Sequence, residues 1–261
     1  MTGEVLAVGR TSTVLDIGGG RVAKVLAAGV PDHWADVEAT FTDEVRRSGA
    51  IAPAVYDVTT VDGRPAVVFE HIVGPSLWQV MLEQPDRTAE LVELLVDVQD
   101  RIHRVGPCAL VPALRDRLRA KVAEVDDVGD SDRAEASRLL DEQPAGSALL
   151  HGDLHPGNVL LGGDGPVVID WFDATIGHPD ADRARTALLL EPVGATDLRH
   201  LPGVTAALVA AISDRYRRLA SPPEPGEAWS QLMALARLAE RTDVDPSGLA
   251  ARWERRGGAD R

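Results

Sequence analysis

The chain has 261 residues, of which 44% are hydrophobic and 26% are charged. This balance is typical of a globular protein and excludes extended disorder. Acidic residues outnumber basic ones by 41 to 27, which gives a formal net charge of -14. Such a charge repels phosphate backbones and argues against a nucleic-acid partner. It would attract a cationic ligand, although its most general effect is solubility.

Cysteine content and hydropathy indicate where the protein works. Cys108 is the single cysteine, so no internal disulfide can form, a reducing compartment fits, and the thiol is expected to be inert. The first residues, MTGEVLAVGR, lack the basic start and long apolar run of a secretory signal. The most apolar later segment, Val204 to Ile212, is too short to cross a bilayer. We expect a cytoplasmic protein without a membrane partner, and no oligomeric state is predicted.

The front of the chain predicts an antiparallel sheet that carries one helix. Gly18-Gly19-Gly20 and Asp62-Gly63 separate β-branched segments, and glycine accepts the positive φ angles of hairpin turns. Val37, Phe41 and Val45 recur at four-residue spacing and predict a helix over 32–48. The predicted strands are Glu4–Val8, Thr13–Ile17, Arg21–Leu26, Val55–Val61 and Pro65–His71.

Beyond Gly74-Pro75 the hydrophobic pattern becomes mainly helical. A β-rich interlude over Ala148–Asp170 interrupts it. This order matches neither an alternating βαβ protein nor a β-sandwich. The predicted helices are Glu90–Val105, Leu114–Val125, Asp132–Glu142, Asp182–Leu190, Val204–Leu219 and Ala228–Arg241.

The interlude carries the most informative residues. The sequence reads HGDLHPGNVLL from His151, and VVIDWFD from Val167. It resembles the aminoglycoside phosphotransferase family, relatives of the protein kinases that also include choline kinases, because the HGDxxxxN and IDW signatures are both intact. The resemblance implies an α+β, protein-kinase-like two-lobed fold. An N-lobe over 1–73 would bind nucleotide with its sheet and helix, and a mostly helical C-lobe over 74–261 would hold the catalytic loop and the substrate.

The same resemblance assigns roles to the polar residues of the interlude. Phosphoryl transfer depends on positioning and charge neutralisation. Asp153 would hold the acceptor hydroxyl and take its proton, and Asn158 and Asp170 would hold Mg²⁺, which needs few protein ligands because it keeps waters. His151 is expected to support the loop through hydrogen bonds. His155 is expected either to touch a phosphate or to be solvated.

In the N-lobe, Lys24 is a charge within an apolar strand. By resemblance it would bind the α/β-phosphates of ATP or GTP, and Val22, on the same face, would cover the adenine. Its acidic partner would be Glu38, with Glu44 as the alternative. Ser12, in the turn after Gly9, would help to cradle the phosphates.

The segment that ends the predicted sheet resembles the hinge between kinase lobes. The backbone of Glu70 and Ile72 would then contact the adenine edge, and Phe69 would sit at the back of the pocket. The alternative is an ordinary edge strand that ends at a turn.

The predicted function is ATP-dependent transfer of the γ-phosphoryl group to a hydroxyl of a small molecule. Asp182 would brace the catalytic loop, and the stretch from Asp170 to Asp182 is too short for the activation segment of a protein kinase. An aminoglycoside or similar cationic antibiotic fits the acidic charge, with antibiotic resistance as the biological role. The alternatives are choline, an amino alcohol or a sugar as acceptor, a pseudokinase-like binding module, and an atypical protein kinase. Four C-lobe acids are expected to be solvated rather than substrate contacts: Glu191, Glu224, Glu227 and Glu240.

Overall fold

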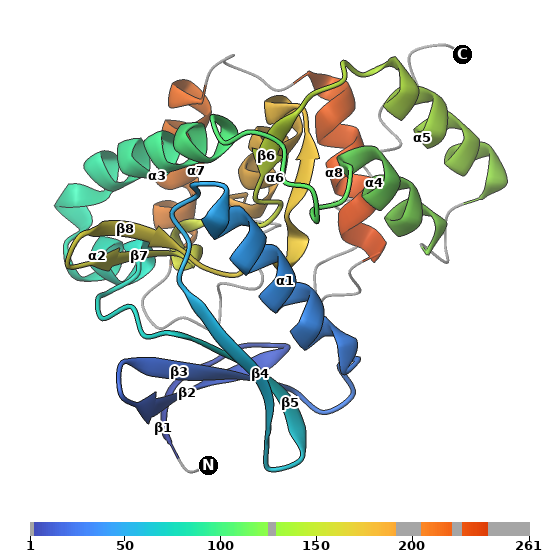
Figure 1. Ribbon diagram of the computed structural model, residues 1–261. Coiled ribbons are helices and arrows are strands. Elements are labelled where there is room, and N and C mark those ends of the chain that lie inside the picture. Colours follow the sequence, from blue (N-terminus) through green and yellow to red (C-terminus); the bar gives the residue numbers. More distant parts are fainter. Residues whose placement is uncertain (1–2, 125–128, 192–204, 221–225, 240–261) are drawn as a thin grey trace.

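The computed structural model describes residues 3–124, 129–191, 205–220 and 226–239. A β-sheet forms one end of the molecule and a mostly helical lobe forms the other (Figure 1). The predicted two-lobed α+β architecture is therefore confirmed. The predicted residues Val125, Val204, Glu224, Glu240 and Arg241 lie outside the described residues.

The N-lobe sheet has five antiparallel strands in the order β1-β2-β3-β5-β4, as predicted. Ala23 and Val25 point to one face of β3, where they pack against Val61 and Ala66. Because side chains alternate along a strand, Lys24 faces the opposite side. The strands are β1 (Glu4–Val8), β2 (Ser12–Gly18), β3 (Arg21–Leu26), β4 (Val55–Val61) and β5 (Arg64–Glu70).

Helix α1 (His33–Arg47) covers the face of the sheet that carries Lys24. Its buried apolar residues pack with Leu26, Val67 and Phe69 of the strands. At its other side the ring of Trp34 lies 4.5 Å from the ring of Phe172, centroid to centroid, in the C-lobe. The helix thus contacts both lobes, which fixes the position of its buried Glu38 relative to the C-lobe.

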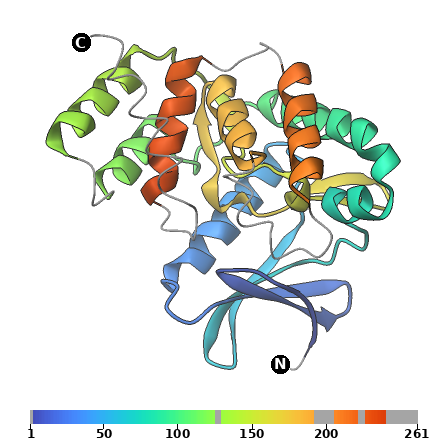
Figure 2. The same cartoon turned by 180° about the vertical axis from the view of Figure 1, so that it is seen from behind.

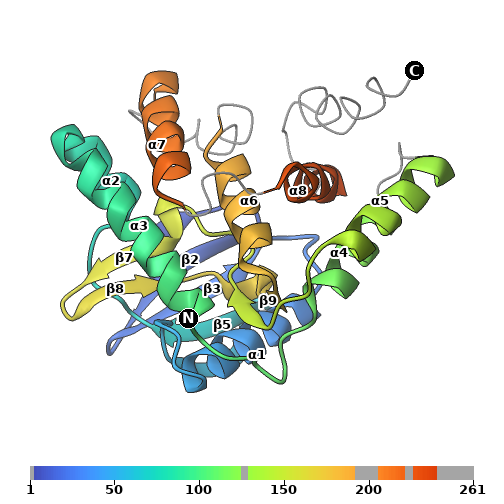
Figure 3. The same ribbon diagram turned by 90° about the horizontal axis from the view of Figure 1, so that it is seen from above.

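Among the described residues, the C-lobe has seven α-helices packed around two short antiparallel strand pairs. Helices α6, α8 and α4 lie next to one another, as Figures 2 and 3 show. The helices are α2 (Leu77–Glu83), α3 (Thr88–His103), α4 (Leu114–Ala123), α5 (Asp130–Glu142), α6 (Pro179–Leu189), α7 (Ala206–Leu219) and α8 (Glu227–Ala239).

The β interlude forms two separate antiparallel pairs. Strand β6 (Ala148–Leu150) pairs with β9 (Thr175–Gly177), and β7 (Val159–Gly162) pairs with β8 (Gly165–Val168). The HGDxxxxN motif, residues 151–158, is the connection from β6 to β7. The IDW motif follows β8, so the two motifs meet at one end of the β7–β8 hairpin.

Two elements were not predicted individually. Helix α2 has only seven residues, but Ser76 and Gln79 form a capping box, which is a signal visible in the sequence. Strand β9 has three residues and exists only because β6 lies beside it. Helix α6 begins at Pro179 rather than Asp182, because the His178 ring accepts a hydrogen bond from the Asp180 N–H at 3.3 Å and Pro179 suits the first turn.

Candidate active site

The HGD segment forms a tight loop whose backbone is held by His151. This fully buried ring accepts a hydrogen bond at Nδ1 from the Asp153 N–H (3.2 Å), so its Nε2–H donates to the Ile169 carbonyl (3.0 Å). Gly152 has a φ of +80°, and a Cβ there would lie 2.3 Å from the Asp173 carbonyl oxygen. Only glycine fits such a position. His151 thus has the contacts of a supporting residue rather than of a proton carrier.

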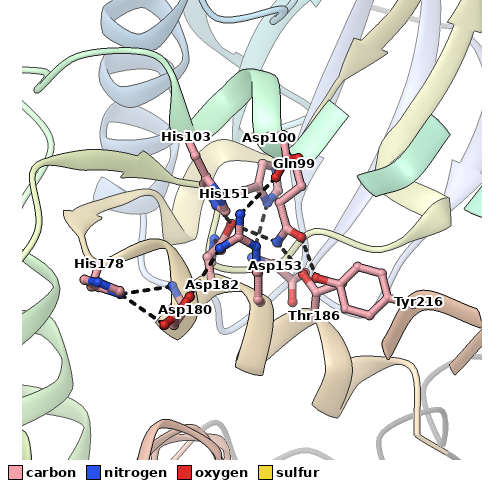
Figure 4. A network of polar contacts seen from close by, with 12 residues as sticks. Gln99, Asp100, His103, His151, Asp153, His178, Asp180, Asp182, Thr186 and Tyr216 are labelled. Atoms are coloured by element: carbon pink, nitrogen blue, oxygen red, sulfur yellow. Dashed lines mark hydrogen bonds and ion pairs between the residues drawn. The ribbon is translucent and has the colours of Figure 1, made fainter. Parts of the chain in front are cut away.

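Asp182, in the first turn of α6, holds this loop in place through a hydrogen bond to the loop backbone. Its Oδ1 accepts from the Gly152 N–H (2.8 Å), and its Oδ2 lies 2.9 Å from His103 Nε2 and 3.1 Å from Gln99 Nε2 (Figure 4). Burial favours the neutral acid, but the hydrogen bonds and the His103 ring outweigh it and lower the pKa of Asp182 to about 2. Gln99 in turn accepts from the Tyr216 hydroxyl.

Asp153 leaves this loop with its carboxylate partly exposed. Its Oδ1 lies 3.6 Å from Arg185 Nη2, and its Oδ2 lies 3.9 Å from His155 Nε2. Arg185 also donates from Nε to the Gly152 carbonyl at 3.0 Å, so it holds the loop and the carboxylate together. The His155 ring accepts from the Gly157 N–H at 3.0 Å, and burial lowers its pKa. His155 is thus half-buried and turned toward Asp153.

Asn158 and Asp170 lie on adjacent ends of the β7–β8 hairpin. The backbone Ile169 N–H donates to the Asn158 carbonyl (3.0 Å), so the backbone of Asn158 lies beside the residue that precedes Asp170. Asn158 Nδ2 donates to the Asp153 carbonyl at 2.9 Å, so its Oδ1 is the atom left for a cation. Asp170 has a left-handed φ of 66°, which is uncommon outside glycine and typical of functional sites. An amide oxygen and a carboxylate are the donors that Mg²⁺ prefers, so this pair fits the ion.

Lys24 joins the two lobes. Its Nζ donates to Glu38 Oε1 at 2.6 Å and to Asp170 Oδ1 at 3.1 Å. Burial acts to lower the pKa of Lys24, but Asp170 and Glu38 outweigh it and hold the pKa above its usual value. Burial also disfavours charge on Asp170, and Lys24 nonetheless lowers its pKa. The alternative partner, Glu44, instead accepts from the Ala109 N–H at 2.8 Å.

The residues predicted to form the adenine site lie on β3, at the end of β5 and in the segment after β5 that was predicted to be the hinge. Phe69 is buried beside Val22 in the cluster under α1. The Glu70 side chain accepts from the Ala54 N–H at 3.1 Å, so it fixes the start of β4. A Cβ at Gly162 would lie 3.2 Å from Ile72 Cγ2, so the hinge touches the β7–β8 hairpin.

In the turn after β1, which was predicted to cradle phosphates, Ser12 is buried and its carbonyl accepts from the Gly9 N–H at 2.8 Å. Its neighbours Arg10 and Thr11 line the cavity described next.

A cavity of about 490 Å³ lies between the lobes. Lys24, Glu38, Asp153 and Asp170 all line it, and its volume suits a small molecule. Sequence reasoning missed several further lining residues, which α1, α4, α8 and the turn after β8 contribute. Their only sequence signal is the four-residue spacing of two α4 cations. These residues are Trp34, Arg117, Ala120, Lys121, Glu124, Phe172, Asp173 and Arg237.

Other candidate residues lie away from this cavity. Cys108 is buried and burial raises the pKa of its thiol, as expected for an inert cysteine. Glu191 pairs with Arg217, and Glu227 accepts from Gln231. Within the described ranges, no helix has the length and apolarity to span a membrane, and no group of three or more His, Cys, Asp or Glu is arranged to hold a metal.

Comparisons with known proteins match this geometry. The model of the phosphotransferase enzyme family matches residues 14–220. No curated protein sequence matches the chain.

Solved structures share the fold. A thermostable mutant of an aminoglycoside phosphotransferase, in complex with AMP-PNP and hygromycin B, is 19% identical with a TM-score of 0.63, over 98% of this chain and 94% of that one. An aminoglycoside-3'-phosphotransferase of type VIII is 23% identical with a TM-score of 0.60, over 92% of each chain. A choline/ethanolamine kinase family protein from Mesorhizobium loti is 16% identical with a TM-score of 0.53, over 98% of this chain and 86% of that one. The chain belongs to the phosphotransferase enzyme family.

Proposed function

We propose that this protein transfers the γ-phosphoryl group of ATP, or of GTP, to a hydroxyl of a small molecule. The observation that carries the proposal is that Lys24 and Glu38 of the N-lobe and Asp153 and Asp170 of the C-lobe line one cavity. Lys24 contacts Asp170, which is 146 residues away in sequence, and Asn158 donates to the backbone of Asp153. A side-chain arrangement of this kind suits a triphosphate and its divalent ion.

Each group has a defined task in the transfer. Lys24, oriented by Glu38, would bind the nucleotide phosphates. Asn158 and Asp170 would hold Mg²⁺, which supplies charge neutralisation on the phosphate oxygens. Asp153 would align the acceptor hydroxyl, whose oxygen attacks the γ-phosphorus while the bond to the β-phosphate oxygen breaks, and would accept the hydroxyl proton.

Two alternatives receive less support. A binding module without turnover would not need all of Lys24, Asp153, Asn158 and Asp170, and all four are present. A protein kinase would need a long segment between Asp170 and α6, where this chain has a short strand followed directly by the helix.

Substitution of Asp153 tests the proposal. Asp153→Asn should lower transfer by about 10²- to 10⁴-fold, because the amide cannot take the hydroxyl proton. Mg·AMP-PNP affinity should stay close to that of the wild type. ADP release should be measured with a panel of hydroxylated compounds, with the exposed turn variant Asp164→Asn as the matched control. A fully active Asp153→Asn protein would show that the assignment is wrong.

A further inference from the structure

A buried chain of hydrogen bonds connects helix α7 with the HGD loop, residues 151–153. The Tyr216 hydroxyl of α7 donates to Gln99 Oε1, and Gln99 Nε2 donates to Asp182 Oδ2 at 3.1 Å (Figure 4). Asp182 Oδ1 accepts from the Gly152 N–H at 2.8 Å, and Gly152 directly precedes Asp153. All residues of α7 are described, and none of them lines the cavity. The chain therefore reaches the proposed reacting position from a helix outside the cavity wall.

The donors and acceptors of this chain can pair in one direction only. The Asp182 carboxylate, with a pKa of about 2, is an acceptor near neutral pH and takes a hydrogen bond from Gln99 Nε2. The amide oxygen of Gln99 must then face Tyr216, whose hydroxyl supplies the hydrogen. Burial raises the pKa of this phenol, so the hydroxyl stays protonated. The other Nε2 hydrogen goes to Thr186 Oγ1 at 3.1 Å, so both polar atoms of the amide have partners.

Burial makes the orientation of this amide depend on the Tyr216 hydroxyl. Gln99 and Tyr216 are each 1% exposed. Without the hydroxyl, Gln99 Oε1 would lose its hydrogen-bond donor in the interior, which is unfavourable. If the amide turned over instead, its oxygen would face Asp182 Oδ2, and two acceptors repel each other. Either change weakens the contact that fixes Asp182, and with it the restraint on the Gly152 N–H.

We propose that Tyr216 and Gln99 are positioning residues for phosphoryl transfer. The Tyr216 hydroxyl orients Gln99, and Gln99 fixes Asp182. Asp182 in turn holds the Gly152 N–H, which sets where the Asp153 carboxylate meets the acceptor hydroxyl. This inference rests on the proposed function and assigns a role to residues outside the HGDxxxxN and IDW signatures. Because neither Tyr216 nor Gln99 lines the cavity, their loss should slow the transfer step and leave binding unchanged.

One test measures the loop directly and needs no acceptor. Tyr216→Phe removes the hydroxyl and keeps the ring. Exchange of the Gly152 amide hydrogen, followed by NMR, should become about tenfold faster, because the hydrogen bond of this amide opens more often. The hydrogen-bonded Leu161 amide of β7 is the internal reference and should exchange as in the wild type. Ser213→Ala, which removes a hydroxyl from a buried residue of the same helix outside this chain, is the matched control.

A second test measures turnover with the compound of the hydroxylated panel that releases ADP fastest. Tyr216→Phe should lower kcat about tenfold, while KM for this compound and the affinity for Mg·AMP-PNP stay close to those of the wild type. Gln99→Met should lower kcat at least as much. Adding Tyr216→Phe to Gln99→Met should cause no further loss, because both residues act through the same contact with Asp182. Ser213→Ala should keep the wild-type kcat.

Several results would overturn the inference. One is unchanged Gly152 exchange in Tyr216→Phe, and another is faster exchange at Leu161 as well, which would indicate a general loss of stability. A wild-type kcat in Tyr216→Phe, with or without a raised KM, or additive losses in the double variant would also contradict it. Failure of the proposed function has a different signature: the wild type neither binds Mg·AMP-PNP nor releases ADP with any compound, while Gly152 exchange still responds to Tyr216→Phe. The chain of hydrogen bonds would then restrain the loop without serving phosphoryl transfer, and the positioning role would be wrong.

Discussion

Lys24 shows how one residue can connect two lobes. Its ammonium group lies between Glu38 of α1 and Asp170 of the C-lobe. The local sequence indicates an unusual lysine, because a charge within an apolar strand needs partners. It cannot identify them, since Glu38 and Glu44 are both on the same helix. The choice follows from the side of α1 that faces the sheet, where Glu38 is buried.

At the scale of single residues, the metal role proposed for Asp170 can be tested by substitution. Asp170→Ala should weaken Mg·AMP-PNP binding by at least about tenfold, because a carboxylate ligand of the ion is removed. Affinity for nucleotide without Mg²⁺ should change much less. Calorimetric titrations with and without the ion give both numbers. The exposed β4 variant Asp57→Ala is the control, and an unchanged Mg²⁺-dependent affinity in Asp170→Ala would contradict the metal role.

At the scale of elements, the catalytic loop owes its shape to helices α3 and α6. Asp182 of α6 holds the Gly152 N–H, while Gln99 and His103 of α3 hold Asp182 (Figure 4). Arg185, one turn further along α6, holds the Gly152 carbonyl. The N–H and the carbonyl of Gly152 are therefore both hydrogen-bonded to side chains of α6. These two bonds restrain the loop relative to that helix.

This brace predicts a pH dependence of stability. The pKa of Asp182 falls from 3.8 to about 2 on folding, so the folded state favours the carboxylate. The stabilisation is complete above about pH 4 and is lost as the pH falls toward 2. Asp182→Asn should lower the free energy of unfolding by about 2 kcal/mol at pH 7, and this difference should shrink near pH 2.

Denaturant unfolding of the wild type and Asp182→Asn at pH 7, 4 and 2.5 measures the effect. Asp180→Asn, two residues earlier and paired with Arg183, serves as a control. A difference between wild type and Asp182→Asn that stays constant with pH would show that the carboxylate charge does not stabilise the fold.

At the scale of the whole molecule, the proposed nucleotide site takes residues from both lobes. The β7–β8 hairpin is joined to the hinge through the Leu161 N–H, which donates to the Pro75 carbonyl at 2.8 Å, and α1 contacts Phe172. A ligand that bridges Lys24 and Asp170 therefore couples the stabilities of the sheet and of the helical lobe.

Mg·AMP-PNP at a hundred times its Kd should raise the free energy of unfolding by about 2.7 kcal/mol, because it binds only the folded protein. This corresponds to an increase in melting temperature of about 5–10 °C. Lys24→Met should lose most of the shift, and Mg²⁺ alone should produce none. Thermal unfolding followed by circular dichroism measures it, and an equal shift in Lys24→Met would exclude Lys24 from nucleotide binding.

The sequence determined the features that depend on neighbouring residues. The five sheet strands, the helix between the third and fourth strands, and the paired HGDxxxxN and IDW segments follow from hydrophobic periodicity, turn glycines and motif spacing, which are local. The family model matches residues 14–220, which include both motifs. The short elements α2 and β9 carried too few residues for a periodic signal.

Only the tertiary structure decided which distant groups meet. It paired Lys24 with Glu38 and Asp170, placed Asp182 beneath Gly152, and brought Arg117 and Lys121 of α4 beside Asp173. Net charge is a sum over the whole surface, whereas the charge of a cavity depends on the few side chains that folding directs into it. For that reason the net charge of -14 does not predict which charged side chains line the cavity between the lobes.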